Sequence, residues 1–204
     1  MLTQAFYTNK NTIDVAKNLL GKILVTKMEG LVTKARIVET EAYCGITDKA
    51  CHAYNNKRTK RTEIMFANGG VCYIYLCYGM HYLFNVVTNT INNPHAVLVR
   101  AVEPLEGLEI MQKRTGKKEN DFTITKGPGN VTKALGITNN QNGYSLLQNT
   151  IYIEEDDFIL SSKQIINTPR IGVHYAKEDA LLLYRFFIKN NLFVSGKKID
   201  NFAN

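Results

Sequence analysis

Two short stretches carry the side chains best suited to chemistry. The segment RIVETEAY at Arg36–Tyr43 alternates as a strand does, so Glu39, Glu41 and Tyr43 are predicted to point to one face. The segment YIYLCYGMHYLFN at Tyr73–Asn85 places four tyrosines within ten residues. A carboxylate held among aromatic rings suits chemistry on a flat, electron-poor ring. The combination favours a damaged nucleobase as substrate.

The charge balance indicates the kind of partner. The chain of 204 residues has 25 Lys and Arg against 18 Asp and Glu, a formal net charge of +7. A positive excess favours a polyanion, because cationic side chains neutralise phosphates and release their counterions. A mildly basic enzyme without a nucleic-acid partner is the alternative. The basic run NNKRTKRT at Asn55–Thr62 is predicted to be a loop, which could contact phosphates or remain solvated.

Targeting and cysteine patterns bear on the compartment. The N-terminal sequence MLTQAFYTNK lacks the pattern of a signal peptide, and no apolar run reaches membrane-spanning length. Cys44, Cys51, Cys72 and Cys77 do not form a disulfide framework, and Cys44, Cys51 and His52 lack the spacing of a zinc site. We therefore expect reduced thiols, no metal, no membrane association and a cytoplasmic location.

Periodicity and turn residues predict the secondary structure. Thr12 is the expected N-cap of a helix through Leu20, with Gly21 as its stop. Helices are also predicted over Pro104–Thr115, and from Pro128 to the stop at Gly136. The predicted strands are Ile23–Met28, Lys34–Tyr43, the hairpin Val71–Cys77 with Met80–Thr88, Ala96–Val102, Ile151–Ile153 and Phe158–Leu160. The segment Ala176–Val194 fits either a helix or a strand.

Five segments occur in an order and spacing that match a known family. They are RIVETEAYCG at Arg36–Gly45, the single His52, YIYLCYGMHYLFN at Tyr73–Asn85, VLVRAVEPLEG at Val97–Gly107 and KGPGNVTKALGI at Lys126–Ile137. Together they resemble the alkyladenine (3-methyladenine) DNA glycosylase family of base-excision repair enzymes. The likeness runs from about Lys17 to Ser195, nearly the whole chain.

The resemblance implies a fold and an activity. The fold would be α+β: a single compact domain over residues 1–204, with a mostly antiparallel curved sheet, surrounding helices and a protruding β-hairpin. The activity would be monofunctional hydrolysis of the N-glycosidic bond of 3-methyladenine, 7-methylguanine, hypoxanthine or ethenoadenine flipped from double-stranded DNA. The family uses no metal or organic cofactor and acts as a monomer, and the short termini suit a bacterial version.

Glu41 is the predicted general base. Replacing the bond to a base requires an activated water beside a sugar with oxocarbenium character, and a carboxylate can both accept the proton and stabilise the charge. Alternation alone leaves Glu39 as a rival, and the resemblance selects Glu41. A surface carboxylate or an ion-pair partner is the alternative for either residue.

The resemblance places Tyr43, His52 and Tyr75 in the base pocket, with Asn85 and Leu98 at its wall. Aromatic faces stack on a flipped base, and the ring quadrupole favours an alkylated base that carries positive charge. The amide of Asn85 would crowd the exocyclic amino group of normal guanine. Ordinary strand packing is the alternative for the tyrosines, and a structural histidine is the alternative for His52.

Other residues receive roles in DNA binding and in holding the water. The resemblance makes Tyr78, beside Gly79, the wedge that fills the gap left by the flipped nucleotide. Arg100 would hold the catalytic water or a phosphate, and Pro169–Val173 would contribute a backbone carbonyl to that water. Lys126 and Gly127 precede a predicted helix start, where backbone N–H groups favour phosphate.

Two other functions fit parts of the sequence. YIYLCY is similar to the stacking strands of single-strand RNA binders, so a non-catalytic nucleic-acid-binding module is possible, although such a module does not need Glu41. A hydrolase using Glu39 and Glu41 as a pair would have both carboxylates on the same side of the bond. Neither key motif contains the lysine that a Schiff base would need, so we predict hydrolysis without strand cleavage.

Overall fold

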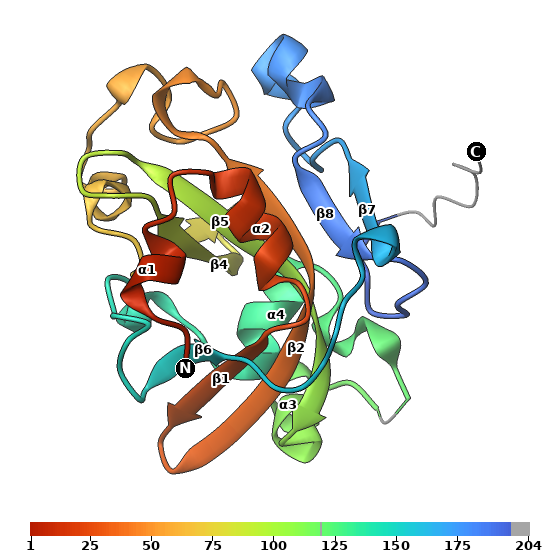
Figure 1. Cartoon of the computed structure of the whole chain (residues 1–204). Helices are drawn as coiled ribbons and strands as arrows, with labels where there is room; N and C mark the ends of the chain where they lie inside the picture. Colours follow the sequence, from red (N-terminus) through yellow and green to blue (C-terminus); the bar gives the residue numbers. More distant parts are fainter. Residues whose placement is uncertain (119, 197–204) are drawn as a thin grey trace.

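A computed structural model describes residues 1–118 and 120–196 (Figure 1). In these residues eight strands form one curled sheet in the order β3-β4-β5-β2-β1-β6, with β8 pairing with β2 and β7 with β8. Every pairing between named strands is antiparallel. The strands are β1 Ile23–Met28, β2 Leu31–Tyr43, β3 Cys72–Cys77, β4 His81–Thr88, β5 His95–Glu106, β6 Ile151–Glu154, β7 Ile165–Thr168 and β8 Arg185–Ile188.

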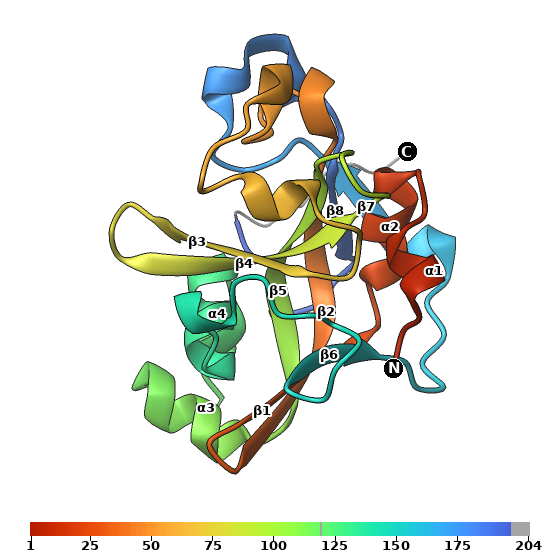
Figure 2. The same ribbon diagram turned by 90° about the vertical axis from the view of Figure 1, so that its left-hand side faces the viewer.

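The predicted α+β class with an antiparallel sheet is confirmed, and so is the hairpin. Figure 2 shows β3 and β4 projecting from the body of the molecule. The long strand β2 pairs with β5 on one side, and with β1 and then β8 on the other. Because β2 is central, the residues near its carboxyl end lie between β5 and β8, two strands from distant parts of the chain.

Four α-helices lie within the described residues: α1 Gln4–Tyr7, α2 Thr12–Leu19, α3 Leu108–Thr115 and α4 Pro128–Leu135. The prediction of Thr12 as N-cap is wrong by one residue. The Asn11 side chain accepts hydrogen bonds from the backbone N–H groups of Ile13 and Asp14. The Thr12 hydroxyl instead bonds to Thr88, so it joins the helix to the sheet.

The helix predicted to open at Pro104 begins later. β5 continues to Glu106, and α3 starts at Leu108 after Gly107, whose φ is +76°. Pro104 lies opposite Ala35 beside a register shift in β2, on a part of β5 that β4 does not reach. Proline is tolerated in sheets at such irregular or edge positions. The second proline-initiated helix, α4, is confirmed with Pro128 at its start and Gly136 at its end.

The remaining differences concern short elements. The prediction of a strand at Phe158–Leu160 is wrong: the segment is irregular, and Phe158 packs against the Arg36 guanidinium with 4.2 Å from Cζ to the ring centroid. α1 and β7 were not predicted, and the ambiguous tail contains both the end of a 3₁₀ helix and β8. The 3₁₀ helices are η1 Gly45–Thr47, η2 Tyr54–Asn56, η3 Glu63–Phe66, η4 Phe122–Thr125, η5 Asn139–Gln141, η6 Ser162–Gln164 and η7 His174–Leu181.

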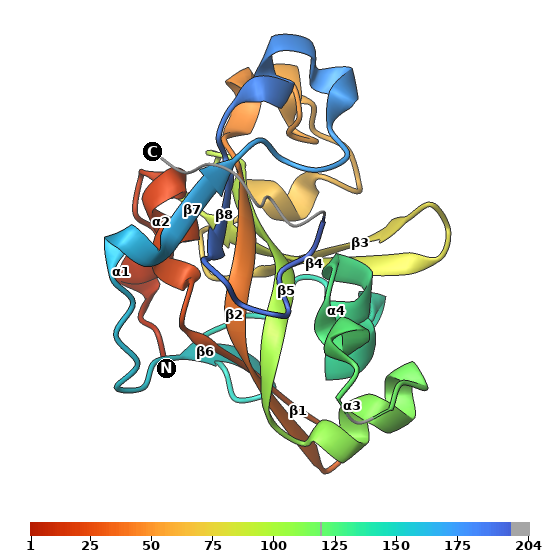
Figure 3. The same cartoon turned by 90° about the vertical axis from the view of Figure 1, so that its right-hand side faces the viewer.

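Two packed clusters set up the functional region. The main core joins the sheet to α2 and α4 through residues such as Leu19, Ile37 and Leu135. A smaller cluster packs against Tyr43 and Tyr75 and consists of Cys51, Ala53, Met65, Phe66, Tyr73, Val87 and Ala96. Figure 3 shows η7 and the segment between β2 and β3 gathered at one end of the sheet. This end holds the candidate site.

Candidate active site

Glu41 lies near the carboxyl end of β2 with no exposed surface. Its Oε1 accepts a hydrogen bond from the Ile171 backbone N–H at 2.8 Å and lies 3.2 Å from Arg100 Nη1. Its Oε2 accepts a hydrogen bond from the Tyr43 hydroxyl at 2.8 Å. An ionised carboxylate has about four acceptor directions, so these three contacts leave room for one further donor.

Glu39 differs from Glu41 in being fully engaged. It accepts hydrogen bonds from Arg100 Nε at 2.9 Å and Arg185 Nε at 2.7 Å. The backbone N–H and the hydroxyl of Ser195 add contacts of 2.6 and 2.9 Å. Four donors occupy the acceptor capacity of the carboxylate, and it too has no exposed surface. The two arginines give Glu39 an ion-pairing role, whereas Glu41 is the carboxylate that is hydrogen-bonded to Tyr43.

Arg100 joins the two carboxylates. A buried arginine needs an anionic partner, and Arg100 has two, Glu39 and Glu41. Burial lowers the pKa of Arg100, but the charges of Glu41 and Glu39 outweigh it and raise the pKa above its ordinary value. The guanidinium is therefore a permanent positive charge beside the Glu41 carboxylate.

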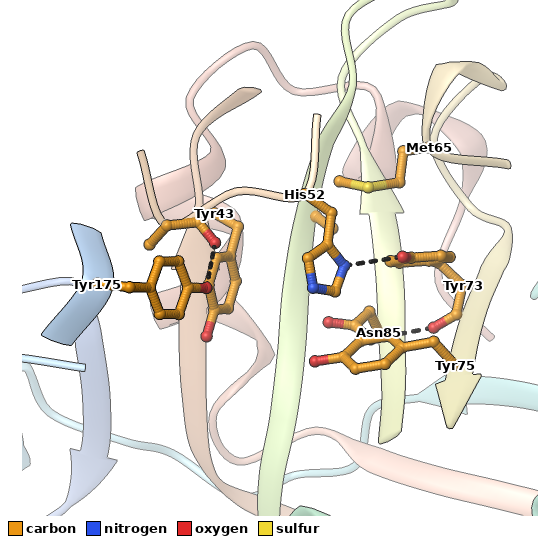
Figure 4. Close-up of a pocket in the computed structure, with 9 residues that line it drawn as sticks. Tyr43, His52, Met65, Tyr73, Tyr75, Asn85 and Tyr175 are labelled. Atoms are coloured by element: carbon orange, nitrogen blue, oxygen red, sulfur yellow. Dashed lines mark hydrogen bonds between the residues drawn. The ribbon is translucent and has the colours of Figure 1, made fainter. Parts of the chain in front are cut away.

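A small pocket next to this network is lined mainly by aromatic side chains (Figure 4). The lining residues are Tyr43, Ala50, His52, Met65, Tyr73, Tyr75, Asn85, Ala96 and Tyr175. The predicted pocket residues Tyr43, His52, Tyr75 and Asn85 are therefore brought together. The cavity has a volume of about 30 Å³, which is room for one or two waters.

Tyr43 connects the pocket to Glu41. Its ring lines the cavity and its hydroxyl donates to the carboxylate. Burial, with a smaller contribution from Glu41, raises the pKa of Tyr43 well above its ordinary value, so the hydroxyl keeps its proton. The Tyr43 ring also contacts Arg170, whose Cζ lies 4.9 Å from the ring centroid.

The opposite wall is built around His52. Its Nδ1 lies 2.9 Å from the Tyr73 hydroxyl, and its ring meets Tyr75 edge to face at 4.7 Å. Burial, and then the charges of Arg61 and Lys57, lower the pKa of His52 to about 4. His52 is therefore neutral at physiological pH. Tyr73 lines the cavity as well as contacting His52.

Asn85 and Leu98 lie side by side across the β4–β5 pair. The Asn85 amide donates to the Tyr73 carbonyl at 3.1 Å, which fixes it at the pocket wall. Leu98 is buried opposite Glu41 in the β2–β5 register and lies outside the lining of the cavity. It packs beneath the site, between the strands that carry the carboxylate and the amide.

The expected DNA-contacting residues lie outside the pocket. Tyr78 is at the hairpin tip, 87% exposed, with a φ of +50°. Lys126 forms a β-bridge with Ala101, next to Arg100 in the sequence, and Gly127 caps the N-terminus of α4. The structure thus places Tyr78 where it has no core to pack into. It places Lys126 opposite Ala101, the neighbour in sequence of the buried Arg100.

Several residues of the site received no role of their own from the sequence. Asp48 and Arg170 form a buried bidentate pair with contacts of 2.6 and 2.8 Å. Arg185 and Ser195 complete the Glu39 network, and the exposed Tyr175 forms the rim of the pocket with its hydroxyl on the Ala50 carbonyl at 3.1 Å. The Pro169–Val173 segment reaches the site through the Ile171 N–H; its predicted carbonyl contact to a water remains a prediction.

Three further features bear on ligands and location. In residues 1–118 and 120–196, no set of three or more His, Cys, Asp or Glu side chains is arranged to hold a metal ion. The four cysteines are free thiols, and burial raises the pKa of Cys44 to about 12 and that of Cys51 to about 11. No described helix combines the length and the apolar character that crossing a membrane requires.

The chain is similar to known proteins over most of its length. The family model described as Methylpurine-DNA glycosylase matches residues 5–192. A Chlamydia felis protein named "Putative 3-methyladenine DNA glycosylase" is 47% identical over 189 residues, covering 92% of this chain and 96% of that protein. Proteins with the same name from Bdellovibrio bacteriovorus and Clostridium perfringens strain 13 are 45% and 43% identical, covering 97% and 96% of this chain and 100% and 99% of theirs. The chain belongs to the methylpurine-DNA glycosylase family of DNA repair enzymes.

Proposed function

We propose that this protein removes alkylated and deaminated purines from double-stranded DNA by monofunctional hydrolysis of the N-glycosidic bond. Its substrates would be 3-methyladenine, 7-methylguanine, hypoxanthine and ethenoadenine, and the product an abasic site in an intact strand. The observation that carries the proposal is the buried Glu41, which has one acceptor direction free and is hydrogen-bonded to an aromatic wall of the pocket.

The pocket suits a flipped purine. The base would lie between Tyr43 on one side and His52 and Tyr75 on the other, since both sides line the same cavity. The two sides would be farther apart in the complex than they are in the structure. Stacking on aromatic rings contributes roughly 1–3 kcal/mol per base. The Asn85 amide, held by the Tyr73 carbonyl, would face the edge of the base and crowd the amino group of normal guanine.

Glu41 would then act on a water beside the sugar. The carboxylate accepts a proton from the water as it attacks, and its negative charge stabilises the oxocarbenium character of the transition state. The Ile171 N–H, the Tyr43 hydroxyl and Arg100 fix the orientation of the carboxylate. No lysine lines the pocket within the described residues, which favours hydrolysis over Schiff-base chemistry.

The surface would engage the duplex as a monomer in the cytoplasm. Tyr78 at the hairpin tip would enter the space left by the flipped nucleotide. Lys126, Gly127 and the N-terminal end of α4 would contact phosphates, because unpaired backbone N–H groups there favour anions. The net charge of +7 supports the long-range attraction that such binding needs.

A base-release assay tests this function. The wild-type protein is incubated with duplexes that each carry one of the four lesions, and both the free base and the strand are analysed with and without alkali. We expect one free base per alkali-sensitive site and an uncut strand before alkali. If none of the four bases is released, the proposal is wrong. If the strand is cleaved before alkali is added, the proposal that the enzyme is monofunctional is wrong.

A further inference from the structure

Arg61 is an exposed side chain that contacts the base-binding wall. Its Nη2 lies 3.2 Å from His52 Nε2, and its Cζ lies 4.8 Å from the centroid of the Tyr75 ring. Within residues 1–118 and 120–196 it makes no salt bridge. A free guanidinium therefore touches two of the residues proposed to hold the base.

The loop that carries Arg61 is firmly anchored. The buried Thr62 donates its hydroxyl to the Lys57 carbonyl at 2.8 Å and accepts a hydrogen bond from the Thr59 N–H at 2.8 Å. The neighbouring Arg58 is paired with Glu63. These contacts fix the backbone on both sides of Arg61, so its position against His52 is set by the fold of the loop.

The Arg61 contact determines which nitrogen of His52 carries the proton. A guanidinium can only donate hydrogen bonds, so Nε2 must be the acceptor. The neutral ring then carries its proton on Nδ1 and donates it to the Tyr73 hydroxyl at 2.9 Å. A second proton on Nε2 would face the guanidinium directly, and the contact would be lost.

We infer that Arg61 is a positioning residue that fixes the tautomer of His52 and extends into mildly acid pH the range over which this ring is uncharged, so that in that range the pocket accepts purines carrying a formal positive charge as well as neutral ones. This inference rests on the proposed function. An imidazolium in the buried wall would repel a cationic alkylated purine at close range, where charges are poorly screened. The Arg61 charge is exposed, so solvent and salt screen it far more.

The other groups around His52 do not oppose this arrangement. Lys57, from the same loop, is a second cation that disfavours a charged ring. Tyr73 and Tyr75, from β3, are neutral, because burial raises the pKa of both phenols. No anion is among the groups that act on His52, so loss of Arg61 would shift its pKa upward from about 4.

Nuclear magnetic resonance titration of the ring Cε1–H signals tests the first step. The chain has four histidines, and a His52→Gln variant assigns the signal. Arg61→Ala should raise the pKa of His52 toward the ordinary value of about 6.5, while burial keeps it below that value. Lys60→Ala removes the same charge from an exposed position in the same loop and should leave the pKa of His52 unchanged. Equal values in wild type and Arg61→Ala would overturn the inference.

Single-turnover base release tests the consequence for specificity. The rate for 7-methylguanine, which is cationic at acid pH, is divided by the rate for neutral hypoxanthine between about pH 5 and 6.5. For Arg61→Ala the ratio should fall as the pH falls. At about pH 5.5, one unit below the ordinary histidine pKa, the fall should be at most about tenfold, because about a tenth or more of His52 is still neutral there. For wild type and Lys60→Ala it should stay constant.

The two readouts separate the possible failures. A constant ratio in Arg61→Ala, or an equal fall in Lys60→Ala, would overturn the inference about Arg61 while the proposed function stands. If the wild-type protein releases neither base, the proposed function is wrong. The inference about cationic and neutral purines is then wrong too, even if the titration shows that Arg61 lowers the pKa of His52.

Discussion

At the scale of single residues, the site separates two carboxylates that are two positions apart on one strand. Alternation predicted that Glu39 and Glu41 share a face, and both contact Arg100. Glu39 has four donors and Glu41 has three contacts, one of them from a pocket tyrosine. The difference comes from Arg185 and Ser195, about 150 positions away, which explains why alternation alone could not rank the two.

The Tyr43 hydroxyl gives a prediction at this scale. Tyr43→Phe keeps the ring for stacking and removes the hydrogen bond to Glu41 Oε2. A hydrogen bond to a charged group contributes about 1.5–3 kcal/mol, so base release should slow about 10- to 100-fold if the bond orients the carboxylate for reaction. Affinity for lesion DNA should change little, because the aromatic face remains.

The measurement compares single-turnover rates with equilibrium binding to the same duplex. Tyr144→Phe is the matched control, since Tyr144 is an exposed tyrosine outside the pocket lining. An unchanged rate in Tyr43→Phe, or a loss confined to binding, would show that the hydroxyl does not act through Glu41.

At the scale of elements, a buried ion pair ties together the two segments that frame the pocket. Asp48, in the loop after β2, pairs with Arg170, which precedes η7. Arg170 also donates to the Ala42 carbonyl at 2.8 Å and to the Asp179 carbonyl at 3.2 Å. The segment that carries Ile171 is thereby held against the end of β2, which positions its N–H on Glu41.

Asp48→Asn should destabilise the protein strongly. It leaves the buried Arg170 without its counter-charge, and breaking such a pair costs about 3–5 kcal/mol. Urea unfolding measures the change in free energy. Glu155→Gln is the control, because its pair with Lys22 is exposed to solvent and should contribute little to stability. Similar losses in the two variants would contradict the structural role of the Asp48–Arg170 pair.

The β3–β4 hairpin gives the second prediction at this scale. Tyr78 at its tip is 87% exposed, so Tyr78→Ser should leave stability unchanged. If the ring fills the gap in the duplex, the variant should lose about tenfold in affinity for a paired lesion, and much less for a lesion that is already unpaired. Fluorescence anisotropy with both duplexes measures this, with Tyr144→Ser as control. Equal losses on the two duplexes would exclude insertion.

Elements encoded by local pattern were predicted well, and those set by distant contacts were not. The hairpin follows from two tyrosine-rich runs around Tyr78-Gly79, and α4 from Pro128 and Gly136. β7 and β8 form because they pair with each other and β8 pairs with β2, over a separation of more than 140 residues. Pro104 misled the prediction because a proline beside a register shift is compatible with a strand as well as with a helix start.

At the scale of the whole molecule, the net charge is consistent with the family assignment. The excess of seven positive charges was predicted to favour a polyanion, and the family assignment agrees with DNA as that partner. The pocket residues Tyr43, His52, Tyr75 and Asn85 were identified from motifs in the sequence. Tyr175 and Arg61 were not, because each reaches the pocket only through tertiary contacts of its loop.

The central claim is that Glu41 performs the chemistry, and Glu41→Gln tests it most directly. Glutamine keeps the size of the side chain and removes the base, so general-base loss alone should slow release by about 100- to 10,000-fold. The measurement is the single-turnover rate of hypoxanthine release from duplex DNA, alongside the dissociation constant for that duplex. The account predicts near-complete loss of release with binding retained; release at the wild-type rate by Glu41→Gln would contradict it.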